Sequence, residues 1–229
     1  MGDGCNPKLP INLSILEKIF SRICLTSSKH ITFWAACLVA FFSFFRKSNL
    51  FISDKDKFES GKHLSRHDIH LSNQGTILSI TWSKTIQFKE RCLLIPLPCI
   101  PGSPFCPTQA LTLAFALTRQ ADPQGPAFVY QSRGTIIPLT YESFLSQLHI
   151  ILQECGLDPA RYSGHSFRRG GASFALECGL PADLIQTQGD WRSDAYKRYL
   201  DPSLSLRLKV AYTLGSVCGS SHYNGIGER

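Results

Sequence analysis

The residues best suited to chemistry lie in the last third of the chain. His165 and Arg168 stand in the run Gly-His-Ser-Phe-Arg-Arg-Gly-Gly, and residues at this spacing share one face of a helix. A histidine can transfer a proton near neutral pH, and an arginine can hold a phosphate through two parallel hydrogen bonds. Trp191 and Tyr199 follow, and a tyrosine hydroxyl brought close to that pair is a potential nucleophile. This combination predicts a site that cleaves phosphodiester bonds.

The elements that must position these residues follow from the spacing of the apolar side chains. That spacing predicts a mainly α fold with a small antiparallel β-sheet, of the α+β class. Helices are expected over residues 13–23, 31–45, 107–120, 140–155, 163–179 and 181–189, from 193 to before Pro202, and over 204–217. Strands are expected over 78–82 and 91–97, joined by a hairpin tip at 83–88, with a short strand or hairpin over 127–138.

The composition bounds the class of protein. Of the residues, 43% are hydrophobic and 18% are charged, which favours a large buried core over disorder. The apolar run 31–45 is shorter than the roughly 20 residues that a membrane span needs, so a buried helix is expected there. The net charge of +7 suits a polyanionic partner, although many basic proteins bind none.

Cysteines and histidines give no sign of a metal or disulfide framework. The nine cysteines are odd in number and form no CxxC pair, so free thiols in a reducing compartment are expected. His63, His67 and His70 are spaced like metal ligands, but no carboxylate or cysteine completes a site, and no metal is expected. Gly170 and Gly171 inside a predicted helix cost about 1 kcal/mol each relative to alanine. They indicate a close backbone approach, either to a neighbouring helix or to DNA.

Five short motifs, taken in order, resemble those of the catalytic domain of the tyrosine recombinase (phage integrase) family. The likeness is greatest to the recombinases of eukaryotic mobile elements, and it runs from about Lys8 to Pro202. An arginine ends an apolar helix, a lysine lies in a β-hairpin, a His-x-x-Arg box follows, and a tryptophan and a tyrosine come last. The resemblance identifies the candidate catalytic residues as Arg46, Lys84, His165, Arg168, Trp191 and Tyr199.

The resemblance also implies a role for each candidate. Tyr199 would attack the scissile phosphorus and form a 3′-phosphotyrosyl link, releasing a 5′ hydroxyl. Arg46 and Arg168 would hold the non-bridging oxygens, because the planar guanidinium group of arginine binds two such oxygens better than the ammonium of lysine does. Lys84 would protonate the leaving oxygen and His165 would assist as a base. Religation reverses the step, so neither ATP nor a redox cofactor is expected.

Two departures from the family pattern leave alternatives open. Trp191 would pack and donate its indole N–H toward the phosphate, but the spacing from Trp191 to Tyr199 is one residue shorter than the commonest family spacing. Tyr196 is therefore a rival nucleophile. Asn49 stands where many members carry an acidic residue, which would loosen how the first arginine is held. Lys89 is the alternative to the hairpin lysine if the register slips.

The expected organisation is one domain with a tail. Residues 1–203 would form the catalytic domain, with 1–10 as a flexible lead-in, and 204–229 a C-terminal helix and loose tail. Members of the family usually clamp DNA with a further N-terminal helical domain, for which there is no room before Leu13. The expected partners are double-stranded DNA and further copies of the chain on DNA, with neither a membrane nor a small-molecule substrate.

The resemblance leaves three functions open. The first is a site-specific recombinase or integrase, located in the nucleus if the host is eukaryotic and otherwise in the cytoplasm. The second is a domesticated or truncated DNA-binding module with weak catalysis, which Asn49 and the missing clamp favour. The third is a type IB topoisomerase-like activity that relaxes DNA, which would need neither an oligomer nor a specific site.

Overall fold

The computed structural model describes residues 8–55, 57–82, 92–191 and 193–198, and the two helical positions 208 and 212. It combines α-helices with a three-stranded and a two-stranded antiparallel sheet, so the predicted α+β class is confirmed. The helices are α1 (Leu13–Phe20), α2 (Ser28–Ser43), α3 (Lys47–Leu50), α4 (Pro107–Leu117), α5 (Tyr141–Glu154), η1 (Pro159–Arg161), α6 (Gly164–Glu177), α7 (Ala182–Gln188) and η2 (Asp194–Arg198). The strands are β1 (Ile69–Ser72), β2 (Gly75–Ile80), β3 (Leu93–Pro98), β4 (Val129–Ser132) and β5 (Thr135–Pro138).

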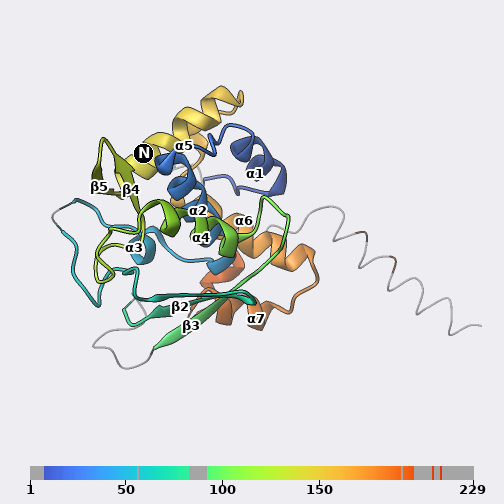
Figure 1. Ribbon diagram of the computed structural model, residues 1–229. Helices are drawn as coiled ribbons and strands as arrows, with labels where there is room; N and C mark the ends of the chain where they lie inside the picture. The colour runs from blue at the N-terminus through green and yellow to red at the C-terminus, as the bar shows by residue number, and fades with distance from the viewer. Residues whose placement is uncertain are drawn as a thin grey trace, which may run out of the picture.

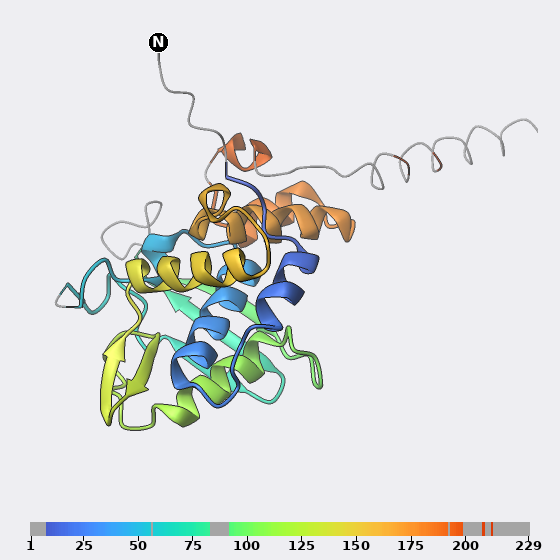
Figure 2. The same ribbon diagram turned by 90° about the horizontal axis from the view of Figure 1, so that it is seen from above.

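Helix α2 is the centre of the core. It contacts α4, α6, β3 and β4, and both ribbon views show it surrounded by other elements (Figures 1 and 2). Its side chains are buried without a break from Ile31 to Phe41, so the predicted buried helix is confirmed. It begins earlier than predicted because the Ser27 side chain accepts the His30 backbone N–H as an N-cap. In the described part of the chain, no helix has the length and apolar character needed to cross a membrane.

The three-stranded sheet has the order β1-β2-β3 and lies along one side of the helices (Figure 1). Leu78 pairs with Ile95 on its buried face, whereas Ile77 and Leu94 on the other face are exposed. This is the predicted alternation of a half-buried strand. Trp82, which was expected within the strand, follows the end of β2, and the hairpin tip 83–91 lies outside the described residues.

The two glycines of α6 allow backbone-to-backbone packing within the protein. A Cβ at Gly170 would lie 1.8 Å from the carbonyl oxygen of Ile11, and one at Gly171 would lie 2.0 Å from that of Phe41. The Ile11 N–H donates to the Ser166 carbonyl at 2.9 Å, which fixes the segment before α1 against α6. Of the two partners left open by the sequence, the one observed is a neighbouring protein segment.

The segment expected to be a flexible lead-in is in part well anchored. Residues 8–10 are described, and the Leu9 N–H donates to the Arg161 carbonyl at 2.8 Å. The Lys8 ammonium donates to the carbonyl of Ala160 at 2.6 Å. Residues 1–7 and the predicted division at 203/204 lie outside the described residues.

Helix ends follow the predicted capping signals. Thr140 accepts the Ser143 N–H at the start of α5, and Gly156 follows this helix with a positive φ of 73°. The short helices α3 and η1 were not predicted, because single turns lack a measurable period. The helix predicted from residue 193 is observed as the 3-10 helix η2. Of the one predicted over 204–217, only Leu208 and Tyr212 are described, and both are helical.

Candidate active site

Arg168 is the buried centre of the candidate site. Its side chain is almost wholly enclosed, with 1% of its surface exposed. The guanidinium donates to the carbonyl of Phe44 and, at 3.0 Å, to the carbonyl of Gly189. The same group lies 3.7 Å from the centre of the Trp191 ring, within the range of a cation–π interaction. Arg168 therefore joins the end of α2 to the turn after α7.

Both segments that Arg168 contacts contain a residue in the left-handed region. Phe44 ends α2 with a φ of 53°, and Asp190 follows α7 with a φ of 50°. Such a conformation costs a side-chain-bearing residue of order 1–3 kcal/mol and persists only where surrounding contacts fix it. The first turn sends the chain from α2 to Arg46. The second requires Gly189, because a Cβ there would lie 1.7 Å from the Trp191 ring.

His165 lies in the first turn of α6, three residues before Arg168. Ser163 caps this helix by accepting the His165 N–H. The imidazole is half-buried, and this burial lowers its pKa below the ordinary value of 6.5; the charges of Arg168, Arg46 and Lys47 lower it further. His165 is therefore neutral at pH 7 and able to accept a proton. These three cations therefore lie close enough to His165 to disfavour its protonated form.

Arg46 lies in the turn between α2 and α3, and Lys47 is the first residue of α3. Arg46 is the N-cap residue of α3, has extended backbone angles and is half-buried. The Lys47 ammonium lies 4.2 Å from the centre of the Tyr141 ring, and the Tyr141 hydroxyl accepts the Gly164 N–H at 3.3 Å. Tyr141 thus contacts both the start of α3 and the start of α6. Neither Lys47 nor Tyr141 was singled out from the sequence, because their contact joins distant segments.

Asn49 has a contact that an acidic residue could not make. It is buried in α3, and its side-chain amide donates to the carbonyl of Trp82 at 3.5 Å. An ionised carboxylate has no proton to donate to a carbonyl oxygen. Asn49 thus connects α3 to the segment after β2, and its expected effect on how Arg46 is held stays a prediction. Trp82 immediately precedes residues 83–91, which include Lys84 and lie outside the described part of the chain.

The rival nucleophile Tyr196 lies in a small apolar cluster. It is 4% exposed, and its ring centroid is 6.0 Å from that of Trp191. The cluster also contains Phe44 and Ile185 and is separate from the main core around α2. Tyr196 is therefore enclosed by side chains. Tyr199 lies outside the described residues, as do Lys84 and its alternative Lys89.

Four of the six candidate residues thus converge, and they come from three separate parts of the chain. Arg46 comes from the end of α2, His165 and Arg168 from the start of α6, and Trp191 from the turn after α7. Trp191 was expected to pack, and it is buried against the Arg168 guanidinium and the Phe44 ring. The arrangement combines a neutral base with fixed positive charge, which suits chemistry on a phosphodiester.

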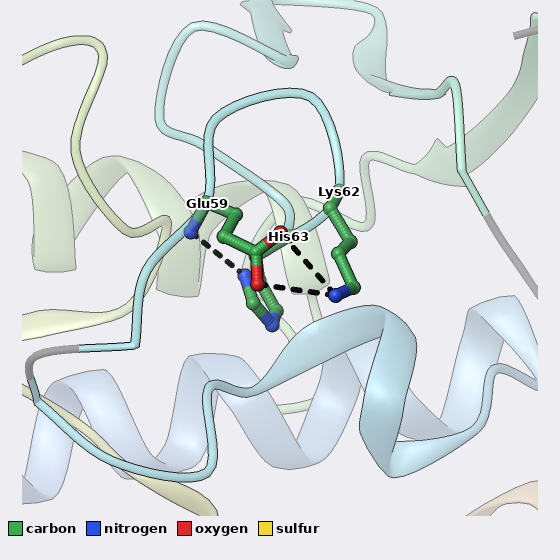
Figure 3. A network of polar contacts seen from close by, with 3 residues as sticks. All are labelled: Glu59, Lys62 and His63. Carbon is green, nitrogen blue, oxygen red and sulfur yellow. Dashed lines mark hydrogen bonds and ion pairs between the residues drawn. The ribbon is translucent and has the colours of Figure 1, made fainter. Parts of the chain in front are cut away.

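No metal was expected at the three histidines that are spaced like metal ligands, and two of them contact other groups through their side chains. His63 Nδ1 accepts the Glu59 N–H at 3.0 Å, beside a Lys62–Glu59 ion pair (Figure 3). His70 Nε2 lies 3.1 Å from the Ser79 hydroxyl. Among the described residues, no three His, Cys, Asp or Glu side chains are grouped so as to hold a metal ion.

Comparison with known proteins gives similarity at the level of structure. No family model matches the chain, and no curated protein matches it. The XerH site-specific recombinase bound to its difH substrate superposes with a TM-score of 0.59 and 17% identity, covering 90% of this chain and 54% of that one. XerA recombinase gives a TM-score of 0.57 and 17% identity, covering 94% and 66%. A lambda integrase dimer bound to a COC′ core site gives 0.56 and 15%, covering 87% and 49%.

The chain therefore spans about half to two thirds of the length of these structural neighbours. At 15% to 17% sequence identity, the structural similarity establishes the fold of this chain. The predicted tyrosine recombinase catalytic-domain-like fold is confirmed.

Proposed function

We propose that this protein is a site-specific DNA recombinase or integrase that breaks and rejoins strands through a covalent 3′-phosphotyrosyl intermediate. The observation that carries the proposal is the convergence of Arg46, His165, Arg168 and Trp191 on one site. The fold supports it independently, because the neighbours described above are recombinases and an integrase.

In the proposed reaction, the Tyr199 oxygen attacks the scissile phosphorus as the bond from phosphorus to the 5′ oxygen breaks. The tyrosine proton passes to neutral His165, and Lys84 supplies a proton to the leaving 5′ oxygen. Arg46 and Arg168 stabilise charge on the non-bridging oxygens. A 5′ hydroxyl from another strand reverses the step, so the bond energy is retained and no ATP or redox cofactor is required.

The position of Arg168 adds a condition to this mechanism. In the free protein, its guanidinium donates to the carbonyls of Phe44 and Gly189. Because the side chain is almost wholly enclosed, contact of its remaining N–H groups with a DNA phosphate requires the surrounding segments to expose it. The weakly catalytic DNA-binding module remains the second candidate, because an Arg168 that stays enclosed would leave Arg46 as the main phosphate ligand.

Covalent trapping on a nicked duplex tests the proposal. Cleavage near the nick lets the short 5′-hydroxyl fragment diffuse away, so a protein–DNA adduct accumulates and is visible on a denaturing gel. We expect the adduct from wild type and from Tyr196→Phe, and none from Tyr199→Phe. Tyr196→Phe keeps the ring that packs on Trp191, so it is a folded control. Loss of the adduct only in Tyr196→Phe would make that residue the nucleophile.

Two further results, one from this experiment and one from a plasmid relaxation assay, separate the other functions. A wild-type chain that binds duplex DNA at low salt but forms no adduct would favour the binding module. Relaxation of supercoiled plasmid by a monomer without site preference would favour the topoisomerase. The narrower kinship with recombinases of eukaryotic mobile elements, and with it a nuclear location, is proposed on the sequence motifs alone.

We also propose that the protein acts as a homo-oligomer on DNA. A groove of about 310 Å³ between α2, β3, α6 and α7 is lined by apolar side chains that include Phe42, Phe174 and Leu184. Leu208 and Tyr212 are helical and exposed, and the apolar segment around them is the proposed occupant from a second copy. Leu184→Glu should reduce the assembly on DNA to a monomer in sedimentation experiments. Unchanged assembly would count against this occupant.

A further inference from the structure

We propose that Lys47 binds a second DNA phosphate, adjacent to the reacting one, in a groove that it forms with His63 and Tyr141. This inference rests on the proposed function, because it names a substrate contact of the same site. It assigns Lys47 to phosphate binding and Tyr141 to positioning.

The Lys47 side chain is exposed but held in place. Its ammonium lies 4.2 Å from the centre of the Tyr141 ring. Tyr141 is fixed at both ends, since its N–H donates to the Ile52 carbonyl at 3.0 Å and its hydroxyl accepts the Gly164 N–H at 3.3 Å. Among residues 8–55, 57–82, 92–191 and 193–198, no carboxylate pairs with Lys47. The cation is thus pre-oriented, and its charge is available to a ligand.

The groove beside Lys47 is large enough for a phosphodiester group. It has a volume of about 290 Å³ and lies between α3, the segment after it and the start of α5. Ser48 and Ser53 line it together with His63 and Tyr141. Hydroxyl, imidazole and ammonium groups are all able to donate hydrogen bonds to phosphate oxygens.

His63 supplies a donor whose tautomer follows from its contacts. Its Nδ1 accepts the Glu59 N–H at 3.0 Å, so in the neutral ring the proton is on Nε2. The second ring nitrogen points away from the Glu59 backbone (Figure 3). Partial burial lowers the pKa of His63 below its ordinary value of 6.5, so the neutral form prevails at pH 7. His63 thus adds a neutral N–H donor to the residues that line the groove together with Lys47.

The groove adjoins the reacting centre. Lys47 follows Arg46 directly, and its charge contributes to the lowered pKa of His165. A strand whose scissile phosphate lies at Arg46 and His165 therefore brings a neighbouring phosphate toward Lys47. Glu142, exposed in the first turn of α5, also lines the groove and opposes an anion there. Removing the negative charge of Glu142 therefore provides a second test of the proposal.

Duplex binding measured against salt concentration tests this proposal. Each phosphate neutralised by a protein cation contributes about 0.9 to the slope of log K against log salt. Lys47→Met should lower the slope by about that amount and weaken binding about 8-fold at 0.1 M salt. Lys47→Arg should retain the wild-type slope. Glu142→Gln should strengthen binding.

The chain offers a matched control at the other end of α2. Lys29 also lies over a tyrosine ring, 5.9 Å from the centre of Tyr130, and α2 has 16 residues and so is about 24 Å long. Lys29→Met should leave the slope unchanged. If Lys47→Met changes it no more than Lys29→Met, the proposal is wrong while the proposed function stands.

Two readouts separate failure of this inference from failure of the proposed function. A wild-type chain that binds no duplex even at low salt refutes the function and the inference with it. Independently of DNA, Lys47→Met should raise the pKa of His165 in an NMR titration, because one of the cations beside the imidazole is removed. An unchanged His165 pKa would show that Lys47 lies too far from the reacting centre to hold the adjacent phosphate.

Discussion

Replacing Arg168 by methionine removes a buried, charged guanidinium group but keeps much of the side-chain volume. Two carbonyl oxygens, those of Phe44 and Gly189, lose a donor in an enclosed site. Leaving a buried acceptor without a donor costs about 1–3 kcal/mol each. Loss of the contact with the Trp191 ring costs up to about 2 kcal/mol when the cation is desolvated.

Two effects reduce the sum. Methionine no longer requires a charged group to leave water, and a buried ion costs several kcal/mol to desolvate. The left-handed turns at Phe44 and Asp190 can also relax once they are not held. We therefore expect Arg168→Met to lower the free energy of unfolding by about 3 kcal/mol, which corresponds to a Tm lower by roughly 6–12 °C for a chain of this size.

The assay is urea and thermal denaturation of wild type, Arg168→Met and Arg46→Met. Arg46 is half-buried and donates to no backbone carbonyl among the described residues, so Arg46→Met should change stability by less than about 0.5 kcal/mol. Equal stability of the two variants would refute the reasoning. It would mean that Arg168 contributes no net stability where it lies and is poised to bind a ligand without breaking useful contacts.

Three further changes probe the site from other sides. Gly171→Ala should destabilise the protein by about 2–3 kcal/mol in urea unfolding, because the new Cβ would lie 2.0 Å from the Phe41 carbonyl; wild-type stability would exclude that close approach. Asn49→Asp should cost about 1 kcal/mol at pH 7, because a carboxylate would face the Trp82 carbonyl, and little at a pH where the carboxyl is protonated and can donate. Folding lowers the pKa of His165, so as the pH drops below 6.5 the unfolded chain binds a proton at this imidazole before the folded chain does. The free energy of unfolding should therefore fall in that pH range. That fall should be smaller in His165→Gln, and an identical pH dependence would count against a lowered pKa.

The parts of the fold that the sequence predicted are those with a local signal. The alternation at Leu78 and Ile80 predicts one buried strand face, and the uninterrupted apolar run of α2 predicts a helix buried on all sides. Thr140 and Gly156 mark the ends of α5 through capping that involves only neighbouring residues. In each case the physical cause acts within a few positions along the chain.

The parts that were missed depend on contacts between distant segments. The sequence places Arg168 on the same face as His165, but it does not show that the guanidinium is enclosed by Phe44 and Gly189. A signal was present, since Gly171 follows Arg168 at a spacing that shares its helix face, and a glycine there indicates that another segment packs closely on that face. The contact of Lys47 with Tyr141 has no comparable trace, because α3 and α5 meet only through the fold.

The separation of the two apolar clusters bears on how the proposed chemistry becomes possible. Phe44, Trp191 and Tyr196 belong to a small cluster apart from the core around α2. A small cluster can open locally at a lower free energy than the whole domain, because few buried contacts are lost. Arg168 could therefore leave its carbonyl contacts for a DNA phosphate without unfolding α2. Arg168 would then both stabilise the free site and bind the reacting phosphate. Its burial in the free protein is therefore compatible with the proposed reaction.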